Sequence, residues 1–378
     1  MAGWIAIAAP VAAVLGLAVL MAQVWALGTW PAREPAPACL PPISVLKPLY
    51  REGAGLYECL RSFCCQDYPA YEIVFGVHDA KDPAIAVVHR LQAEFPERAL
   101  TLVIDPTRRG GNAKIDNLMN LMVGVHHDIL VLADADIRVG PDYLRRLAGP
   151  VQDARVGIVT CLYRGLPAPG RWSRLGALFI QDWFVPQVLL AHALGSADFA
   201  FGATIALRRP VLAACGGFEA LGSQLADDYA LGARTRALGW RTVLSSYCVD
   251  TVVCEPRLRD LAAHQLRWLR TIRLINPWGY AFSGITFGLP LAMIAAVITG
   301  QAWVWGLAFL ALIVRLVLHS RACRRLQAPR RFGLVPLADV LLCGLWALGL
   351  VGRKVRWRGT ILAVGHDGGI KANREQVQ

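Results

Sequence analysis

The chain has 378 residues, of which 55% are hydrophobic and 17% charged, and its formal net charge is +12. This composition excludes an intrinsically disordered chain, because such chains contain too few apolar residues to form a core. It also predicts a membrane protein, since long stretches toward both ends of the chain carry no charged residue.

Residues 1–32 contain no Asp, Glu, Lys or Arg. Their apolar core, from Trp4 to Leu27, exceeds the ~20 residues that span a bilayer, so we predict an N-terminal transmembrane anchor. The alternative is a cleaved signal peptide. That reading requires a positive segment before a shorter apolar core, whereas the first basic residue here is Arg33, after the span.

Residues 33–273 have the composition of a globular domain in which predicted strands and helices alternate. Strands are expected at 43–46, 71–77, 100–104, 128–133, 156–163 and 242–246. Helices are expected between the earlier strands, at 56–65, 84–95, 114–125 and 141–148. Such alternation is typical of an α/β fold with a mostly parallel sheet, whose ligands bind beyond the carboxyl ends of the strands.

Polar residues follow several of these strands and are therefore the first candidates for a binding site. Lys47 and Pro48 follow the first strand, and Asp79 follows the second. A single Asp after a strand also forms turns or caps helices, and this alternative reading of Asp79 stays open.

The loop 108–114, Arg-Arg-Gly-Gly-Asn-Ala-Lys, is basic, rich in glycine and followed by a predicted helix. Backbone N–H groups at such a helix start, together with Lys114, would bind a phosphate. A solvated basic turn is the equal alternative.

Asp134 and Asp136 follow the apolar run that ends at Leu132. Alternation along a strand end points both carboxylates to the same side. Paired carboxylates suit a hard divalent cation that completes its coordination shell with substrate phosphate oxygens.

Two features of the second half of the domain are less distinctive. The apolar stretch Leu175 to Leu194 is predicted to be either an interface helix or a buried core helix. Asp227 and Asp228 open a predicted helix; one would cap it, and the other would be free to act as a base.

The segment His264 to Trp268 immediately precedes the next apolar region. Arg267 there would neutralise a leaving diphosphate, and Trp268 would lie at the membrane interface. The alternative is a positively charged flank with an aromatic belt residue, which is common beside membrane spans.

The C-terminal part is divided into four segments. Residues 274–318 are predicted to form a transmembrane hairpin and 319–332 a basic interfacial segment. Residues 333–352 form a third apolar segment, transmembrane or re-entrant, and 353–378 a basic tail.

Residues 274–378 hold 12 Lys/Arg and 3 Asp/Glu, so +9 of the net +12 lies beside the apolar segments. This distribution fits anionic lipid headgroups better than nucleic acid, and we expect no nucleic-acid partner. Retention of Lys and Arg on the cytoplasmic side explains it equally well. If all three apolar segments span, however, the two basic clusters lie on opposite faces.

The ten cysteines form no Cys-x-x-Cys pair and have no histidine at metal-ligand spacing. They are predicted to be buried apolar side chains in a reducing compartment.

Taken together, these motifs resemble the membrane-bound family 2 and family 21 glycosyltransferases of the GT-A fold. The ceramide glucosyltransferases and the bacterial hopanoid-biosynthesis-associated glycosyltransferases are the most similar groups. The resemblance covers nearly the whole chain and is carried by residues 44–49, 66–69, 82–85, 114–118, 133–138, 226–229 and 264–268.

The resemblance implies a role for each matching residue. Asp79 would contact the uracil end of a UDP-sugar, Asp134 and Asp136 would hold Mg²⁺ or Mn²⁺, and Asp228 would be the general base. Arg267 and Trp268 match the end of the family's Gln/Arg-x-x-Arg-Trp signature, whose first position is His264 here. We assign catalysis to Asp228, Arg267 and Trp268, metal binding to Asp134 and Asp136, and donor binding to Lys47, Pro48, Asp79, Lys114, Asp134 and His264.

The resemblance further implies an inverting transfer of N-acetylglucosamine or glucose from a UDP-sugar to a hydroxyl of a membrane lipid. The expected site of action is the cytoplasmic face of the bacterial inner membrane. A hopanoid polyol is the expected acceptor, and ceramide is the alternative. A processive polysaccharide synthase and a non-enzymatic membrane protein rank lower, and the sequence predicts no oligomeric state.

Overall fold

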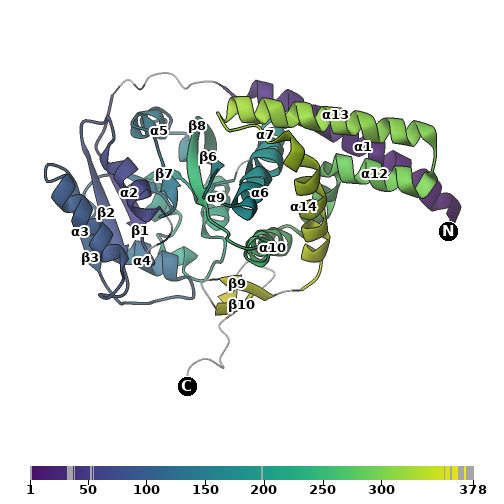
Figure 1. The fold of residues 1–378 in the computed structure, drawn as a ribbon. Coiled ribbons are helices and arrows are strands. Elements are labelled where there is room, and N and C mark those ends of the chain that lie inside the picture. Colours follow the sequence, from purple (N-terminus) through teal and green to yellow (C-terminus); the bar gives the residue numbers. More distant parts are fainter. Residues whose placement is uncertain are drawn as a thin grey trace.

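The structure is a computed structural model, and it describes residues 2–371 except 32–36, 38, 52, 54, 197–198, 353, 358–359 and 365–369. A globular domain forms one part of the molecule. Helices from both ends of the chain form an arm that extends from it (Figure 1).

One eight-stranded sheet organises the globular domain, in the order β3-β2-β1-β4-β7-β6-β8-β5. β7 and β5 run opposite to the other strands. The strands are β1 (Ile43–Pro48), β2 (Tyr71–Val77), β3 (Ala99–Ile104), β4 (Ile129–Leu132), β5 (Ile137–Arg138), β6 (Val156–Pro167), β7 (Ile205–Arg208) and β8 (Arg241–Val253).

The register of the parallel strands brings their carboxyl ends to one edge. Ile43 of β1 lies opposite both Tyr71 of β2 and Ile129 of β4. The residues that follow these strands therefore meet at the same edge, where ligands of parallel sheets bind.

Helices cover both faces of the sheet, which explains why its strands are continuous apolar runs. Val45, Phe75 and Val131 point to one core cluster, and their neighbours Leu46 and Val74 point to another. The first cluster packs against α2 (Leu56–Cys64), α3 (Ala84–Glu94) and α5 (Tyr143–Val151). The second packs against α4 (Ala113–Leu121), α8 (Arg209–Ala214) and α9 (Asp227–Ala237).

The predicted α/β class with a mostly parallel sheet is confirmed. The strands at 43–46, 71–77, 100–104 and 156–163 and the helices between them agree with the structure within a few residues at most ends. β5 and β7 were not predicted, and β5, with two residues, is too short to show a periodicity.

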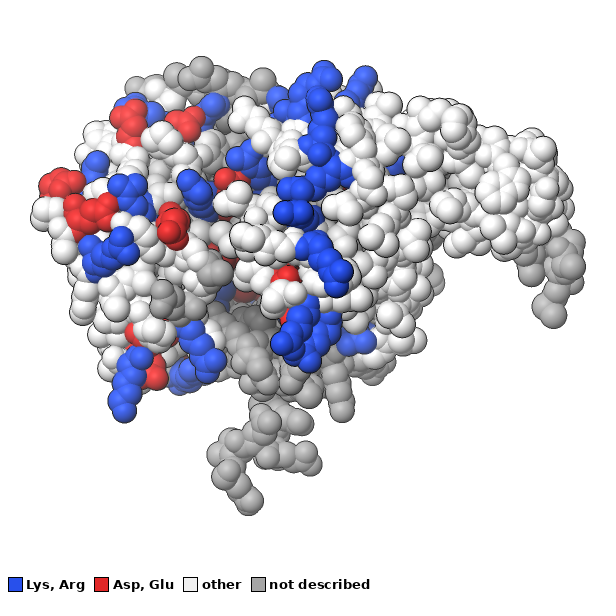
Figure 2. All heavy atoms as spheres, in the orientation of Figure 1, with Lys and Arg blue, Asp and Glu red and all other residues white. Residues whose placement is uncertain are grey.

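The arm consists of α1 (Ala2–Thr29), α12 (Gly288–Thr299) and α13 (Ala302–Arg325), which share one apolar cluster. α1 and α12 approach closely, since a Cβ atom added to Gly16 would lie 2.8 Å from the Cα of Gly288. On the face shown in Figure 2 the arm is almost free of charged side chains, and a stripe of Lys and Arg marks its base.

Among the described residues, three helical segments are long and apolar enough to cross a membrane: Ala6–Thr29, Ala302–Arg325 and Phe332–Gly349. A further candidate is a broken span in which Pro277–Thr286 and Gly288–Thr299 are bent by 69°. The first limb of the predicted hairpin over 274–318 is therefore bent, and its assignment as transmembrane stays a prediction. Pro290 lies in the first turn of α12, where its missing N–H costs nothing, and it favours a new helix start there.

The second limb also differs from the prediction. α13 continues to Arg325, so it includes part of the segment 319–332 that was expected to be interfacial. The side chains of Arg321, Arg324 and Arg330 are exposed at and beyond its end.

α14 (Val335–Gly349), preceded by the short turn η5 (Phe332–Leu334), lies at the base of the arm at a steep angle to α13 (Figure 1). Its Leu342 and Leu345 share a cluster with Leu261 and Leu269 of α10 (Leu258–Ile275), a helix of the globular domain. Just beyond α14, the carbonyl of Gly352 accepts a hydrogen bond from Arg273. The third apolar segment thus starts beside α13 and returns to the globular domain.

Within the predicted basic tail, 353–378, the structure describes only the backbone of β9 (Lys354–Trp357), β10 (Thr360–Val364) and β11 (Ile370–Lys371). The tail's other residues lie outside the described part. All ten cysteines are free, but Cys39, Cys65 and Cys254 are exposed, which corrects the expectation that all are buried.

Candidate active site

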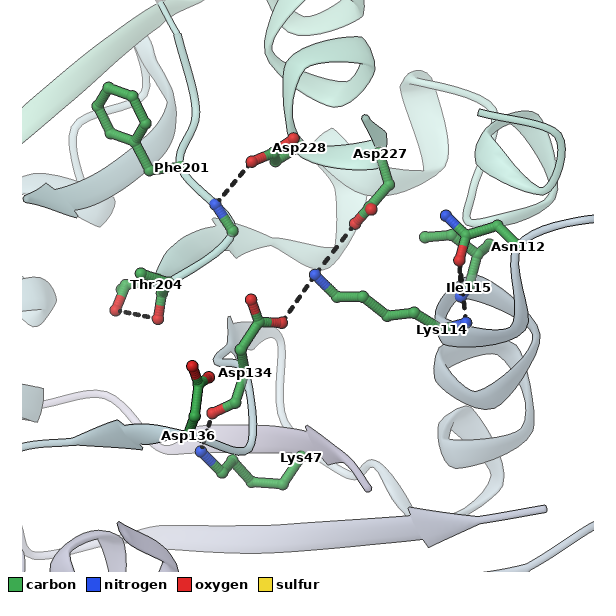
Figure 3. Close-up of polar contacts among 12 residues, drawn as sticks. Lys47, Asn112, Lys114, Ile115, Asp134, Asp136, Phe201, Thr204, Asp227 and Asp228 are labelled. Atoms are coloured by element: carbon green, nitrogen blue, oxygen red, sulfur yellow. Dashed lines mark hydrogen bonds and ion pairs between the residues drawn. The ribbon is translucent and has the colours of Figure 1, made fainter. Parts of the chain in front are cut away.

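Charged side chains from three separate elements converge at the carboxyl edge of the sheet (Figure 3). Lys114 comes from the start of α4, Asp134 from the turn after β4, and Asp227 with Asp228 from the start of α9. The sequence predicted each element, and the fold brings the four side chains together.

Lys114 is the centre of this arrangement. Its Nζ atom lies 2.8 Å from Asp134 Oδ1 and 3.2 Å from Asp227 Oδ2. Burial alone would lower the pKa of Lys114, but the charges of Asp134 and Asp227 raise it well above its usual value. Lys114 is therefore a permanent cation that offsets the repulsion between two carboxylates.

Asp228 is held by backbone donors. Its Oδ2 accepts a hydrogen bond from the N–H of Gly202 at 2.9 Å, and its Oδ1 accepts one from the N–H of Tyr229 at 2.8 Å. Loss of hydration and then repulsion from Asp227 raise the pKa of Asp228 to about 6. A carboxyl group with that pKa is well matched to proton abstraction near neutral pH.

The expectation that one of the two aspartates caps α9 is wrong. The N-cap residue is Ala226, with no side-chain hydrogen bond. Asp227 binds Lys114 instead, because the helix start faces the site.

Gly202, which the sequence analysis did not identify, lies among these groups. A Cβ atom on it would be 3.3 Å from Asp228 Oδ2, 3.4 Å from Asp134 Oδ2 and 3.5 Å from Lys114 Nζ. A side chain at this position would therefore occupy the space that the three charged groups share. Glycine in an irregular loop gives no sequence signal for such a role.

Asp134 and Asp136 lie close together, as predicted, although the reason is a turn and not strand alternation. β4 ends at Leu132, and Asp136 accepts a hydrogen bond from Thr251 Oγ1 at 3.0 Å. Restricted hydration and then repulsion from Asp134 raise the pKa of Asp136. Two adjacent hard oxygen donors that repel each other fit a divalent cation, and Asp134 and Asp136 are the residues that would hold it.

The assignment of Lys47 and Pro48 to donor binding stays a prediction. Both are buried in β1. Lys47 Nζ donates to the carbonyl oxygen of Asp134 at 2.6 Å and lies 3.9 Å from the centroid of the Phe63 ring. Burial lowers its pKa to about 8. Lys47 thus positions the backbone of the Asp134 turn from beneath.

Asp79 is exposed at the end of β2 and forms the turn that was its alternative reading. Its Oδ1 accepts a hydrogen bond from the N–H of Lys81 at 2.9 Å. The contact with uracil implied for this residue stays a prediction.

The predicted phosphate site at the start of α4 is wrong in its backbone part. The side chain of Asn112 caps the helix and accepts hydrogen bonds from the N–H groups of Lys114 and Ile115. The side chain of Lys114 is directed into the site.

Two buried neighbours of Lys114 belong to the segment 114–118 that carries the resemblance, but the sequence analysis gave them no role. Asp116 accepts a hydrogen bond from the N–H of Gly110 at 2.9 Å. Asn117 donates to the carbonyls of Leu49 and Gly76, at the ends of β1 and β2. These residues fix α4, and hence Lys114, to the sheet edge.

Arg267 of α10 is half-buried beside the carboxylates. Burial lowers its pKa, whereas Asp134 and Asp136 are among the groups that raise it. Its guanidinium has no ion-pair partner within the described part of the chain. It is therefore available to an anionic ligand.

His264 and Trp268 support that region. His264 Nδ1 lies 2.6 Å from Glu255 Oε1, and its ring packs edge-to-face on Trp268 at 5.0 Å. Glu255 was not predicted. These contacts show His264 as a neighbour of Trp268, and donor binding by His264 stays a prediction.

An aromatic cluster, Tyr163, Phe184, Phe201 and Trp268, borders the carboxylates. Tyr163 stacks on Phe184 at 4.6 Å and contacts Trp268 edge-to-face at 6.1 Å. Burial and then the charges of Asp228, Asp134 and Asp136 raise the pKa of Tyr163. All four aromatic residues pack against the apolar cluster of α1, α12 and α13, so this wall joins the site to the arm.

The stretch Leu175 to Leu194 contributes Phe184 to this wall. It consists of α6 (Arg171–Phe179), the π-turn Ile180–Phe184 and α7 (Val185–Ala193). Leu175 and Leu189 are buried, and the segment packs between the sheet and the arm.

The sequence profile of glycosyl transferase family 21 matches residues 8–370. Ceramide glucosyltransferase 1 of Caenorhabditis elegans is 26% identical over 215 residues, which cover 57% of this chain and 46% of that protein. An N-acetylglucosaminyltransferase of Rhizobium leguminosarum bv. viciae is 23% identical over 260 residues, 65% of this chain and 59% of that protein. This chain thus matches only about half the length of these curated relatives.

The solved structure of the mannosyltransferase PcManGT from Pyrobaculum calidifontis, in complex with GDP-Man and Mn²⁺, is similar in fold. The TM-score is 0.54 at 22% identity, and the match covers 93% of this chain and 99% of that one. The predicted GT-A glycosyltransferase fold is confirmed.

We expect Gly202→Ala to lower kcat on the order of tenfold or more, because the methyl group fills the space shared by Asp228, Asp134 and Lys114. The fold should persist, as judged by the melting temperature in detergent. Gly306→Ala on α13, where a Cβ atom meets nothing within 4 Å, is the matched control. An unchanged kcat for Gly202→Ala would contradict this view of the site.

A pH profile tests the role of Asp228. The base must be deprotonated, so kcat/KM should rise with pH through about 6, the pKa of Asp228. Asp227→Asn removes a like charge and should move this limb to lower pH, whereas Asp228→Asn should lower turnover by roughly 10²- to 10⁴-fold.

The control for these substitutions is Asp128→Asn, at the opposite, amino-terminal end of β4. A pH profile of kcat/KM that changes in neither Asp227→Asn nor Asp228→Asn would rule out Asp228 as the titrating base.

Proposed function

We propose that this chain, which belongs to glycosyl transferase family 21, transfers a sugar from a UDP-sugar to a hydroxyl of a membrane lipid. One observation carries the proposal. The carboxylate pair and Asp228 face an aromatic wall that is continuous with the apolar core of the arm.

The charged groups have complementary roles in this reaction. Arg267 and Lys114 are cations that would bind the diphosphate of the donor and offset its growing charge as UDP leaves. A Mg²⁺ or Mn²⁺ ion held by Asp134 and Asp136 would stabilise the same diphosphate when bound. The mannosyltransferase PcManGT was solved in complex with Mn²⁺ and a nucleotide sugar, GDP-Man.

Asp228 is the base of the proposed mechanism. Its carboxylate accepts the proton of the acceptor hydroxyl, whose oxygen attacks the anomeric carbon of the sugar on the side opposite to UDP. The bond between the anomeric carbon and the UDP oxygen breaks, so the configuration inverts. Inversion follows from the family resemblance, and hydrogen bonds from Gly202 and Tyr229 keep Asp228 oriented.

We place the globular domain on the cytoplasmic side of a bacterial inner membrane. α1 and α13 would span the bilayer, residues 277–299 would form a broken span between them, and α14 would lie in the cytoplasmic interface, because α14 returns to the globular domain. In this arrangement both basic clusters lie on the cytoplasmic face, as expected if Lys and Arg are retained on that side of the membrane. Leu337, Val340 and Leu348 of α14 are exposed and would contact lipid.

Two acceptors are proposed. A hopanoid polyol, with N-acetylglucosamine as the sugar, follows from the resemblance of the motifs to those of the hopanoid-biosynthesis-associated glycosyltransferases. Ceramide, with glucose, is favoured by the curated ceramide glucosyltransferases among the relatives.

Purified enzyme in mixed micelles tests this proposal. UDP release from UDP-N-acetylglucosamine should increase several-fold when a hopanoid polyol is added, and mass spectrometry should detect the glycosylated lipid. A short-chain ceramide with UDP-glucose tests the second acceptor. Asp136→Asn should lower both rates and raise the concentration of Mn²⁺ needed for half-maximal activity. Release that neither lipid stimulates would contradict a lipid acceptor of these classes.

A further inference from the structure

Outside the active site, the structure contains a network of buried charged and polar side chains where the arm meets the globular domain. It consists of Asp182 in the π-turn, Arg315 and His319 on α13, and Asp339 on α14. The side chains of Asp182, Arg315 and His319 are at most 4% exposed. Such groups are costly to bury in apolar surroundings, and intramembrane ionisable residues commonly mark functional positions.

The hydrogen bonds of His319 define which of its ring nitrogens carries the proton. Its Nε2 accepts the N–H of Arg331 at 2.8 Å, so Nδ1 carries the proton and donates to Asp182 Oδ2 at 2.8 Å. Arg315 forms a two-pronged pair with Asp339 at 2.6 and 2.7 Å, and it lies 3.7 Å from Asp182.

This arrangement is a hydrogen-bond network and not a metal site. Asp182, His319 and Cys323 bring possible ligand atoms within 4.8 Å of one another. The sequence analysis expected no histidine at metal-ligand spacing from a cysteine and therefore did not identify this grouping. Both nitrogens of His319 already have partners, however, and the guanidinium of Arg315 supplies the positive charge.

The π-turn that carries Asp182 is fixed from three sides by consecutive residues. Gln181 donates to the carbonyl of Gly165 in β6, and Asp182 accepts from His319 of α13. Trp183 Nε1 donates to Thr286 Oγ1 beside α12. The next residue, Phe184, then stacks on Tyr163 of the aromatic wall. π-turns of this kind occur often at functional sites.

We propose that the Asp182–His319 pair positions the aromatic wall for the lipid acceptor. The pair fixes the π-turn against α13, the turn places Phe184 on Tyr163, and Tyr163 lies beside Asp228. Asp182 and His319 are thus positioning residues that act through Phe184. This inference rests on the proposed lipid acceptor, and it assigns to the membrane helices a part in acceptor binding beyond anchoring.

Two substitutions of His319 separate its two hydrogen bonds. The amide nitrogen of Asn overlays the Nδ1 position, so His319→Asn keeps the donor to Asp182. The amide oxygen of Gln reaches the Nε2 position, so His319→Gln keeps the bond to Arg331 and loses the bond to Asp182. Asp182→Leu removes the same bond from the other side.

The test measures lipid transfer to a hopanoid polyol and to a short-chain ceramide, hydrolysis of the UDP-sugar without lipid, and UDP affinity as evidence of folding. His319→Gln and Asp182→Leu should raise KM for the lipid, or lower kcat/KM, on the order of tenfold or more. Their hydrolysis rates and UDP affinities should stay within about twofold of the unchanged enzyme, as should all properties of His319→Asn.

A parallel fall in lipid transfer and hydrolysis would overturn the inference, as would equal damage by His319→Asn and His319→Gln. If the unchanged enzyme transfers no sugar to either lipid, the proposed function falls and this inference falls with it. The unchanged enzyme therefore distinguishes the two failures.

Discussion

The candidate active site depends on one buried cation among several carboxylates. Asp134, Asp136, Asp227 and Asp228 lie close together, and their mutual repulsion is offset by Lys114, which contacts Asp134 and Asp227 directly. A buried ion pair is costly to break, because removal of one partner leaves an uncompensated charge. Lys114 therefore keeps Asp134 and the start of α9 together, and repulsion from Asp227 helps keep the pKa of Asp228 near 6.

The sheet and the arm supply the rest of the site in different ways. The charged groups of the site lie at the carboxyl edge of the sheet, and Lys47 and Asn117 fix that edge from within. The arm contributes an apolar surface that continues into the aromatic wall beside Asp228. Charge on one side and apolar surface on the other are what an enzyme needs to join a nucleotide sugar to a lipid.

Local patterns in the sequence predicted much of this structure. The apolar runs predicted strands β1 to β4, and the residues after them predicted where Asp134, Asp136 and Lys114 would meet. The position of Lys47 after an apolar run does not reveal that its ammonium donates to the backbone of the Asp134 turn. Gly202 and Glu255 were missed because their roles depend on contacts between segments distant in sequence.

Contacts between distant segments also explain why features of the membrane-associated part were not predicted. Asp182 and His319 are separated by 137 positions, and no periodicity links them. The bend before α12 had a signal in Pro290, but the absence of charge from Leu274 to Val314 favoured an uninterrupted hairpin. The path of α14 depends on its packing against α10, and a hydropathy profile does not reveal such a contact.

The central claim is that the acceptor hydroxyl reaches Asp228 from the bilayer, along the aromatic wall. Photo-crosslinking tests it directly, with a hopanoid polyol or ceramide that carries a diazirine beside its reactive hydroxyl, in proteoliposomes of the full chain. We predict adducts on peptides that contain Tyr163, Phe184 or Phe201, and their loss when unlabelled acceptor is added. Adducts confined to the outer surfaces of α1, α12 and α13, unchanged by competitor, would contradict the account.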